Sequence, residues 1–296
     1  MEFRVRPIRF EFRAQGPVVF APGLAANTFR GALGLLLREV ACDAACPGAA
    51  TCAKAIECAY ARAFEPRQFI AGPSGFADLP RPFVLRAAAL DGLSYQPGQV
   101  FALDLYLFDE TPAALFAEAL RRLEWAGLGL HRPRVTLERC AELAPVSVPL
   151  DTAGEGTRRL TLRFLTPTEL KSEGRTLREP RFDVILARAR DRVSQLLGIY
   201  QGGAPAWDFR GLGERSRAVQ VVRHQIQQVG SERRSTRTGQ SHSLAGFIGE
   251  AEYAGDLAEF LPALAAASWC GVGRHTVWGQ GWFVVETMET LATAPA

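Results

Sequence analysis

Three groups of residues in this chain have types and spacings that suit chemistry: an arginine-rich run, a glycine-rich loop and four clustered cysteines. The run Arg233-Arg234-Ser-Thr-Arg237-Thr-Gly-Gln-Ser-His242 joins three cations to one imidazole. Guanidinium groups bind phosphate in bidentate fashion, and arginine neighbours favour the neutral imidazole that a general base requires. We therefore predict a phosphate-binding hairpin loop with His242 as candidate base. A loop that is merely solvated is the alternative.

The glycine-rich loop is Gly271-Val-Gly273-Arg274-His275-Thr-Val-Trp-Gly279-Gln-Gly281. Its four glycines let the backbone approach a phosphate closely. The spacing matches neither a dinucleotide-binding fingerprint nor a P-loop, because the third glycine and the Gly-Lys-Ser/Thr sequence are both missing. A helix end followed by a tight turn with positive φ is the alternative for the first two glycines.

The four clustered cysteines fall within 17 residues and are Cys42, Cys46, Cys52 and Cys58. The chain has no apolar run of 18 or more residues and its N-terminus alternates charged and apolar residues, so we expect a cytoplasmic protein with reduced thiols. Four thiolates can close a tetrahedral zinc site, although the spacing C-x3-C-x5-C-x5-C lacks the usual C-x2-C knuckle. The cluster favours a structural zinc over unliganded cysteines. Cys140 and Cys270 resemble ordinary buried thiols.

A repeated motif points to an internal duplication. Trp-x-Gly-x-Gly-x-His begins at Trp125 and again at Trp269, and ends at His131 and His275. The glycine-rich loop contains the second copy. We expect a structural role for both histidines of the repeat, and a surface position on a strand for His224.

Hydrophobic periodicity predicts the same order of elements in each half of the chain. In the first half we expect strands at 2–14, 82–88, 100–108 and 134–143, and helices from Asn27 to about Val40 and at 111–126. Asn27 is the expected N-cap of the first helix. Pro7 indicates a bulge or an edge in the first strand. In the second half we expect strands at 158–165, 218–229, 244–253 and 276–286, and helices at 182–200 and 256–268.

This pattern, β-α-β-β-α-β twice, predicts an α+β protein of two tandem ferredoxin-like domains. The expected N-terminal domain covers residues 1–147 and carries a cysteine-rich insertion at about 42–66. The expected C-terminal domain covers residues 148–296 and carries the glycine-rich loop at 271–281. The linker is expected at 144–156, where prolines and glycines gather.

Charge is distributed unevenly along the chain. The formal net charge is only +3, yet residues 151–240 hold 17 Arg or Lys against 10 Asp or Glu, and residues 241–296 hold 1 against 6. Lys54 and Lys171 are the only lysines, and a GC-rich genome accounts for much of that ratio. The clustering of the arginines indicates a polyanionic partner more strongly than their number does.

Several motifs resemble the precursor-RNA processing endoribonucleases of CRISPR systems, which belong to the RAMP superfamily. The strongest lie between Arg233 and Val285: Ser235-x-Arg237-x-Gly239-Gln240, Leu244-x-Gly246-Phe247-x-Gly249, Gly255-Asp256-Leu257, Phe260-Leu261-Pro262-x-Leu264 and Gly271-Val-Gly273-x-x-Thr276-Val-x-Gly279-x-Gly281. Weaker ones lie earlier: Phe29-Arg30-Gly31-Ala32-Leu33-Gly34, Cys58-x-Tyr60-x-x-x-Phe64-Glu65 and Phe164-Leu-Thr166-Pro167-Thr168-x-Leu170-Lys171. Together they cover nearly the whole chain.

The resemblance implies cleavage of CRISPR repeat RNA without a metal ion, by attack of the 2′-hydroxyl beside the scissile phosphate. It implies RNA contacts at Arg233, Arg234, Arg237, Gly271, Gly273, Arg274, His275, Gly279, Gly281 and Lys171. The family usually has a histidine on or near its first helix, whereas this chain has none before His131. Arg30 and Arg38, eight residues apart, roughly share one face of that helix and are candidates to orient RNA or stabilise the transition state, with His242 or the substrate handling protons.

Two other functions remain open from the sequence. The first is a non-catalytic RAMP subunit that binds crRNA as a scaffold of an effector complex, with other CRISPR-associated subunits as partners. The second is a duplicated metal-binding protein in which the cysteines are central and the arginines only cover the surface. No membrane partner is expected.

Overall fold

The computed structural model describes residues 1–42, 46, 48–49, 51–66, 79–129, 131–151, 156–230, 232–234, 241–243 and 245–287, with the backbone alone at 232–234, 241–243 and 287. The chain divides into two compact units. One consists of Arg4–Val146 and Gly198–Gly203, the other of Met1–Phe3, Ser147–Leu197 and Ala204–Ala296. We call them the N-terminal and the C-terminal unit. Their main boundary follows Val146, close to the expected division at 147/148.

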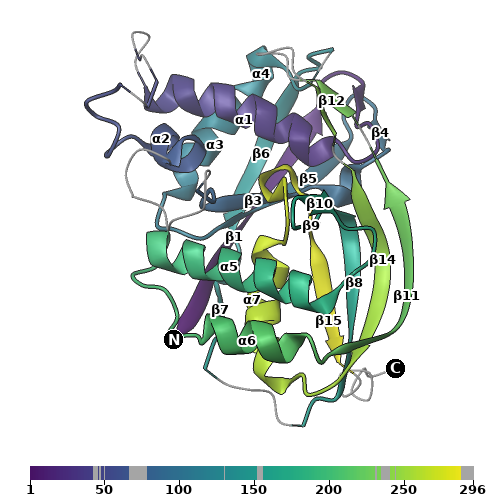
Figure 1. The fold of residues 1–296 in the computed structure, drawn as a ribbon. Coiled ribbons are helices and arrows are strands. Elements are labelled where there is room, and N and C mark those ends of the chain that lie inside the picture. The colour runs from purple at the N-terminus through teal and green to yellow at the C-terminus, as the bar shows by residue number, and fades with distance from the viewer. Residues whose placement is uncertain are drawn as a thin grey trace. The chain divides into compact units, whose positions relative to one another are not determined.

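The N-terminal unit is built on an antiparallel sheet in the order β3-β5-β1-β6. Its sheet strands are β1 (Glu2–Ala14), β3 (Phe83–Arg86), β5 (Val100–Leu107) and β6 (Val135–Glu142), and its helices are α1 (Ala25–Ala41), α2 (Ala59–Phe64), α3 (Ala113–Arg121) and α4 (Leu123–Ala126). Short elements complete it: β2 (Val18–Val19), β4 (Ser94–Tyr95), η2 (Ala88–Leu90) and the start of β7 (Val146–Pro149). Figure 1 shows α1 and α3 side by side. Phe12 of β1 packs on Phe29 of α1 with ring centroids 5.5 Å apart, which joins the helix layer to the sheet.

The C-terminal unit repeats this topology in the order β11-β14-β8-β15. Its sheet strands are β8 (Arg159–Thr168), β11 (Gln220–Val229), β14 (Gly246–Ala254) and β15 (Phe283–Thr287), with helices α5 (Phe182–Tyr200), α6 (Phe209–Ser216) and α7 (Leu261–Cys270). The smaller elements are β9 (Lys171–Ser172), β10 (Arg175–Thr176), β12 (Glu232–Arg234), β13 (Ser241–Ser243), η3 (Ala258–Phe260) and η4 (Thr276–Trp278). In both units the four strands occur in the spatial order second, third, first, fourth, which is the ferredoxin-like arrangement. The predicted fold class is confirmed.

The repeated motif adopts the same backbone shape in both units. Gly127 ends α4 with φ 71° and ψ 163°, and Gly271 ends α7 with φ 79° and ψ 168°. Two residues after each, Gly129 and Gly273 have φ of 72° and 77°. All four positions lie in a region that L side chains rarely occupy, so the shared glycines are explained by the turn after the second helix of each unit.

Two local expectations in the N-terminal unit were wrong. Asn27 lies inside α1, and Leu24 occupies the N-cap position. The first N–H of the helix, that of Ala25, is capped instead by the carboxylate of Asp91 at 2.9 Å, a partner 66 residues away. Pro7 causes neither an edge nor a bulge, because β1 is an interior strand whose register shifts between Glu11 and Phe12.

Three element boundaries also differ from the expectation. The helix expected at 111–126 is divided at Arg122 into α3 and α4. The strand expected from residue 276 begins only at Phe283, because Thr276–Trp278 forms a single 3-10 turn within the glycine-rich loop. The linker expected at 144–156 contains β7, and its residues 152–155 lie outside the described residues.

Candidate nucleic-acid interface

The glycine-rich loop joins α7 to β15 and closes over the end of β8. Its four glycines have φ between 69° and 79°. A Cβ at Gly273 would collide with the carbonyl oxygen of Glu169, and a Cβ at Gly281 with that of Val272. Both obstacles are backbone atoms, which cannot move aside as the tip of a side chain can. Glycine is therefore needed for close approach as well as for φ.

Hydrogen bonds hold the loop in place. The N–H of Arg274 donates to the carbonyl of Glu169 at 3.1 Å, and the N–H of Gly281 donates to that of Pro167 at 3.0 Å. The N–H groups of Gly271 and Gly279 likewise donate to carbonyls within the C-terminal unit. These three glycine N–H groups already have protein acceptors, so phosphate contacts by the loop glycines stay a prediction. The arrangement favours the side chains of the loop as ligand contacts.

A buried carboxylate organises those side chains. Glu169, at the end of β8, is 7% exposed. One of its oxygens accepts a hydrogen bond from Nη1 of Arg274 at 3.0 Å, and the other lies 3.6 Å from Nε2 of His275. The imidazole of His275 stacks on Trp278, with centroids 4.4 Å apart and planes inclined by 6°. This packing gives His275 a structural position, in agreement with the expectation from the repeat.

Arg274 differs from His275 in its exposure. Its side chain is 52% exposed, so the guanidinium contacts Glu169 and also faces solvent. An arginine has five N–H donors, so a guanidinium that binds one carboxylate oxygen can donate to a second acceptor as well. Glu169 was not predicted from the sequence, because a single glutamate between two strands carries no motif. Its role arises from a contact across 105 residues.

Exposed cations surround the hairpin formed by β9 and β10. Lys171 is exposed in β9 and pairs with Thr176, and Arg175 and Arg178 are exposed on and after β10. Arg188 of α5 donates a hydrogen bond from Nη2 to the carbonyl of Lys171 at 3.2 Å. The predicted contact Lys171 therefore lies within a group of four basic residues, two positions along the chain from Glu169. Such a group suits a phosphate backbone.

The arginine-rich run extends the hairpin of β11 and β14. The backbone of β12 pairs with that of β13, and Arg233 lies opposite His242. Arg237 lies outside the described residues, and for Arg233, Arg234 and His242 only the backbone is described. The hairpin expected from the sequence is present in the described strands, while the roles of these four side chains stay predictions.

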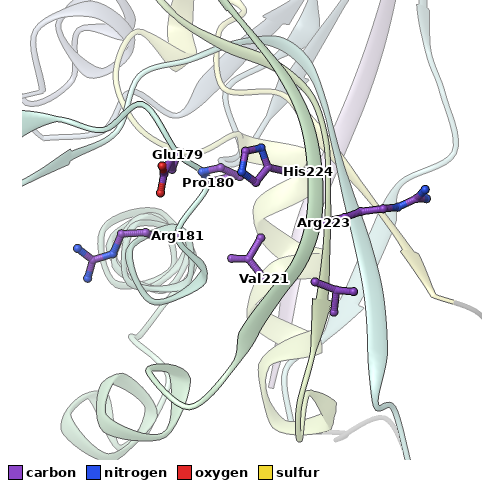
Figure 2. Close-up of a pocket in the computed structure, with 7 residues that line it drawn as sticks. Glu179, Pro180, Arg181, Val221, Arg223 and His224 are labelled. Carbon is purple, nitrogen blue, oxygen red and sulfur yellow. The ribbon is translucent and has the colours of Figure 1, made fainter.

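A pocket of about 400 Å³ lies where β11 faces the start of α5 (Figure 2). Figure 2 shows His224 and Arg223 directed to opposite sides of β11. Arg181 binds the carboxylate of Asp183 at 2.7 Å and Arg223 that of Glu252 at 3.2 Å. His224 is exposed, as expected for a strand-surface residue. The sequence did not single out this pocket, because its lining joins two segments about 40 residues apart.

In the N-terminal unit, α1 and α2 bring together a second group, which we call the α1–α2 cluster: Arg30, Arg38, Tyr60, Phe64 and Glu65. The guanidinium of Arg30 lies 5.3 Å from the ring centroid of Phe64, and that of Arg38 lies 6.0 Å from the centroid of Tyr60. The two rings are stacked, with centroids 5.6 Å apart and planes inclined by 6°. The two arginines share one face of α1, as their spacing indicated.

Tyr60 is held by Glu65 within this cluster. Its hydroxyl donates to Oε1 of Glu65 at 3.1 Å, and Oε2 of Glu65 accepts from the N–H of Ala49 at 3.1 Å. Burial, followed by the charge and hydrogen bond of Glu65, raises the pKa of Tyr60 to about 12, although Arg38 and Arg30 act in the opposite direction. The hydroxyl is therefore protonated at neutral pH and acts as a hydrogen-bond donor.

The four predicted metal ligands lie just after α1 and before α2. Sγ of Cys42 is 3.5 Å from Sγ of Cys58. Burial, together with hydrogen bonds to Cys58 and Cys46, raises the pKa of Cys42 to about 12. A backbone hydrogen bond from Gly48 lowers the pKa of Cys46, and Arg38 adds to this effect. Within the described part of the chain, no group of three or more His, Cys, Asp or Glu side chains is already arranged as a metal site.

Two family models match the chain. Residues 162–283 match the model described as CRISPR-associated endoribonuclease Cas6. Residues 3–163 match a model named AF_1859_N and described as an N-terminal domain. Residues 162–283 therefore form a domain of the Cas6 family. This family comprises RNA endonucleases that process CRISPR RNA, which confirms the family expected from the motifs.

Solved structures agree with this assignment at the level of the fold. A product complex of Cas6 (TTHB231) of Thermus thermophilus is 20% identical, with a TM-score of 0.60, and covers 96% of this chain and 100% of its own. A product complex of Cas6 (TTHA0078) is 21% identical, with a TM-score of 0.55, and covers 96% and 99%. No curated protein matches the chain. None of its described helices is both long enough and apolar enough to cross a membrane.

Proposed function

We propose that this chain cleaves CRISPR precursor RNA within its repeats and without a catalytic metal ion. The observation that carries the proposal is the match of residues 162–283 to a family of endoribonucleases. The exposed cations near the glycine-rich loop support RNA as the substrate. Lys171 and Arg175 closely follow Glu169 in the chain, and Glu169 binds Arg274 of the loop. Two of the similar solved structures are product complexes of Cas6, which is consistent with RNA as the ligand.

The proposed reaction is an internal transesterification. The 2′-oxygen attacks the adjacent phosphorus, the bond to the 5′-oxygen breaks, and the products are a 2′,3′-cyclic phosphate and a free 5′-hydroxyl. The step needs a base for the 2′-hydroxyl, an acid for the leaving oxygen and cations for the phosphorane. Arg30 and Arg38 supply two cations on one face of α1, and arginine stabilises phosphorane charge without metal.

Proton transfer is assigned by protonation state. Tyr60, whose pKa is raised to about 12, carries a proton at neutral pH and so can donate to an oxygen, but it cannot accept the proton of the 2′-hydroxyl. We propose His242 as the general base. The RNA contacts that we propose are Arg233, Arg234 and Arg237, together with Arg274, Lys171, His275 and the loop glycines Gly271, Gly273, Gly279 and Gly281. These contacts hold the phosphate backbone, and the arginine-rich hairpin orients the repeat.

A non-catalytic RNA-binding subunit is the second candidate, and one observation favours it. The chain has no histidine before His131, so its first helix offers no imidazole for proton transfer. In that case the same cations would hold crRNA within an assembly of CRISPR-associated subunits. Two solved relatives with TM-scores of 0.54 are described as Cas6-RT-Cas1–Cas2 complexes, in which the matched part is less than half of a longer chain.

The test is cleavage of a labelled RNA repeat from the chain's own locus in excess EDTA. A second substrate carries a 2′-deoxy nucleotide at the mapped cut site. We expect cutting in EDTA of the all-RNA substrate and none of the deoxy substrate. Binding without cutting would favour the scaffold function, and cutting of the deoxy substrate would exclude attack by the 2′-hydroxyl.

Two variants then assign the roles. Arg30→Ala combined with Arg38→Ala should lower the rate at saturating RNA, and His242→Ala should abolish the limb of the pH–rate profile that reports the base. Arg121→Ala is the matched control, because Arg121 is 54% exposed on α3 and its guanidinium contacts only surface Glu118 among the ion pairs of the described residues.

A further inference from the structure

Among its described residues, the segment between α1 and α2 has only a small apolar core. Its buried apolar cluster consists of Ala49, Ala55 and Ala61, with Cys52 and Cys58 packed against it. Ile56, the one large aliphatic residue of the segment, is 78% exposed. Three alanine side chains bury little apolar area, and segments of this size with so small a core are usually stabilised by disulfides or metal.

Cys42 is in contact with two other thiols of this segment. Sγ of Cys42 lies 3.5 Å from Sγ of Cys58, and Cys42 also shares a hydrogen bond with Cys46. Cys52 packs with Cys58 on the same alanine cluster. In a tetrahedral zinc site with Zn–S bonds of about 2.3 Å, neighbouring sulfurs are about 3.8 Å apart. The observed separation of Cys42 and Cys58 is close to that distance.

We propose that the four cysteines of this segment bind one zinc ion that holds the segment against α1. The remaining pair, Cys140 and Cys270, takes no part, because Cys140 lies on β6 and Cys270 ends α7. Zinc is the ion expected for four thiolate ligands in a small closed site. Zinc with four thiolates carries a net charge of −2, and the exposed Lys54 and Arg38 of the same region offset part of it.

The zinc site positions a residue of the α1–α2 cluster. Nη2 of Arg38 donates to the carbonyl of Cys46 at 2.7 Å, and the same guanidinium lies over the ring of Tyr60. A ligand loop fixed by metal therefore fixes one acceptor of Arg38. The N–H of Ala49 is bound by Glu65, which in turn holds Tyr60. Arg38 and Tyr60 thus both depend on the conformation of the segment, although neither contacts the ion.

The decisive measurement is the metal content of the purified, full-length chain. We expect one zinc per chain and no iron or acid-labile sulfide. Cys42→Ser and Cys58→Ser should each lose at least tenfold in bound zinc, while Cys140→Ser should keep a full equivalent. Absence of zinc in the wild-type chain, or full occupancy in both serine variants, would overturn the proposal. Iron with sulfide would overturn it as well.

A second measurement on the wild-type chain keeps the test valid if the serine variants do not fold. Replacement of the zinc by cobalt should give the visible absorption bands and the thiolate charge-transfer band of tetrahedral cobalt with sulfur ligands. Thiol titration should find four of the six cysteines protected until a chelator is added. A spectrum of octahedral cobalt, or a pair of thiols lost to a disulfide between Cys42 and Cys58, would refute a zinc site.

Discussion

Replacing Gly273 by alanine tests why the glycine-rich loop is built as it is. Gly273 has φ 77°, and its Cβ would meet the carbonyl oxygen of Glu169. Gly174, in the turn between β9 and β10, has φ 78°, and a Cβ there would have no atom within 4 Å. The two positions share their backbone conformation and differ in the space around them. Gly174→Ala is therefore a matched control for Gly273→Ala.

The expected magnitudes follow from this difference. Alanine in the left-handed region costs about 1–2 kcal/mol at either position. At Gly273 the loop must also move away from the end of β8, which costs about 1–3 kcal/mol, as overpacking a core does. This movement also strains the hydrogen bond from the N–H of Arg274 to the carbonyl of Glu169, which is worth about 1 kcal/mol. We expect losses of roughly 1–2 kcal/mol for Gly174→Ala and roughly 3–6 kcal/mol for Gly273→Ala.

Thermal unfolding followed by tryptophan fluorescence is the assay. Four of the five tryptophans, at positions 207, 269, 278 and 282, belong to the C-terminal unit and report its unfolding. The midpoint of Gly273→Ala should lie about 5–10 °C below that of Gly174→Ala. Equal midpoints for the two variants would refute the reasoning, because they would mean that φ alone, and not the approach to Glu169, requires glycine.

Two further predictions concern the α1–α2 cluster. Arg38→Ala should reduce the slope of log K against log salt for repeat RNA by about 1, as expected for one lost phosphate contact, and Arg121→Ala should leave it unchanged; equal slopes for both variants would count against a phosphate contact at Arg38. Because the pKa of Tyr60 is raised from 10.0 to about 12, its neutral form stabilises the fold below pH 10, and this contribution declines as the pH rises toward 12. Urea midpoints measured from pH 9.5 to 11.5 should fall more steeply for the wild type than for Tyr60→Phe, with little background from lysine because only Lys54 and Lys171 are present. Parallel curves would contradict the raised pKa.

Patterns within single elements were predictable from the sequence. The alternation of residues 2–14 matches β1, and the apolar spacing of residues 182–200 matches α5, at both ends. Each pattern depends on which side chains of one element are buried, and that depends on a local period of two or 3.6 residues. The repeated motif was also predictable, because both glycine pairs adopt positive φ in the turn after the second helix of a unit.

Contacts between distant residues were not predictable. The cap of α1 comes from Asp91, and no local motif indicates a carboxylate 66 residues away. Likewise, the 3-10 turn of Thr276–Trp278 delays β15, because the loop must first close over Glu169. Helical spacing predicted that Arg30 and Arg38 share one face of α1. Their partners Phe64 and Tyr60 lie on α2, which follows the cysteine segment, and the spacing within α1 does not indicate them.

The sequence by itself determined the duplicated ferredoxin-like order of elements, the family and the residue types available for RNA and metal. Hydrophobic periods, glycine positions and charge clusters are properties of short segments, so they can be recognised without knowledge of the fold. Only the tertiary structure decided that Glu169 neutralises Arg274 beside His275, that Tyr60 stays protonated beside Arg38, and that Cys42 meets Cys58. These are pairings across a topology, where the energy depends on distances of a few ångströms that no local pattern encodes.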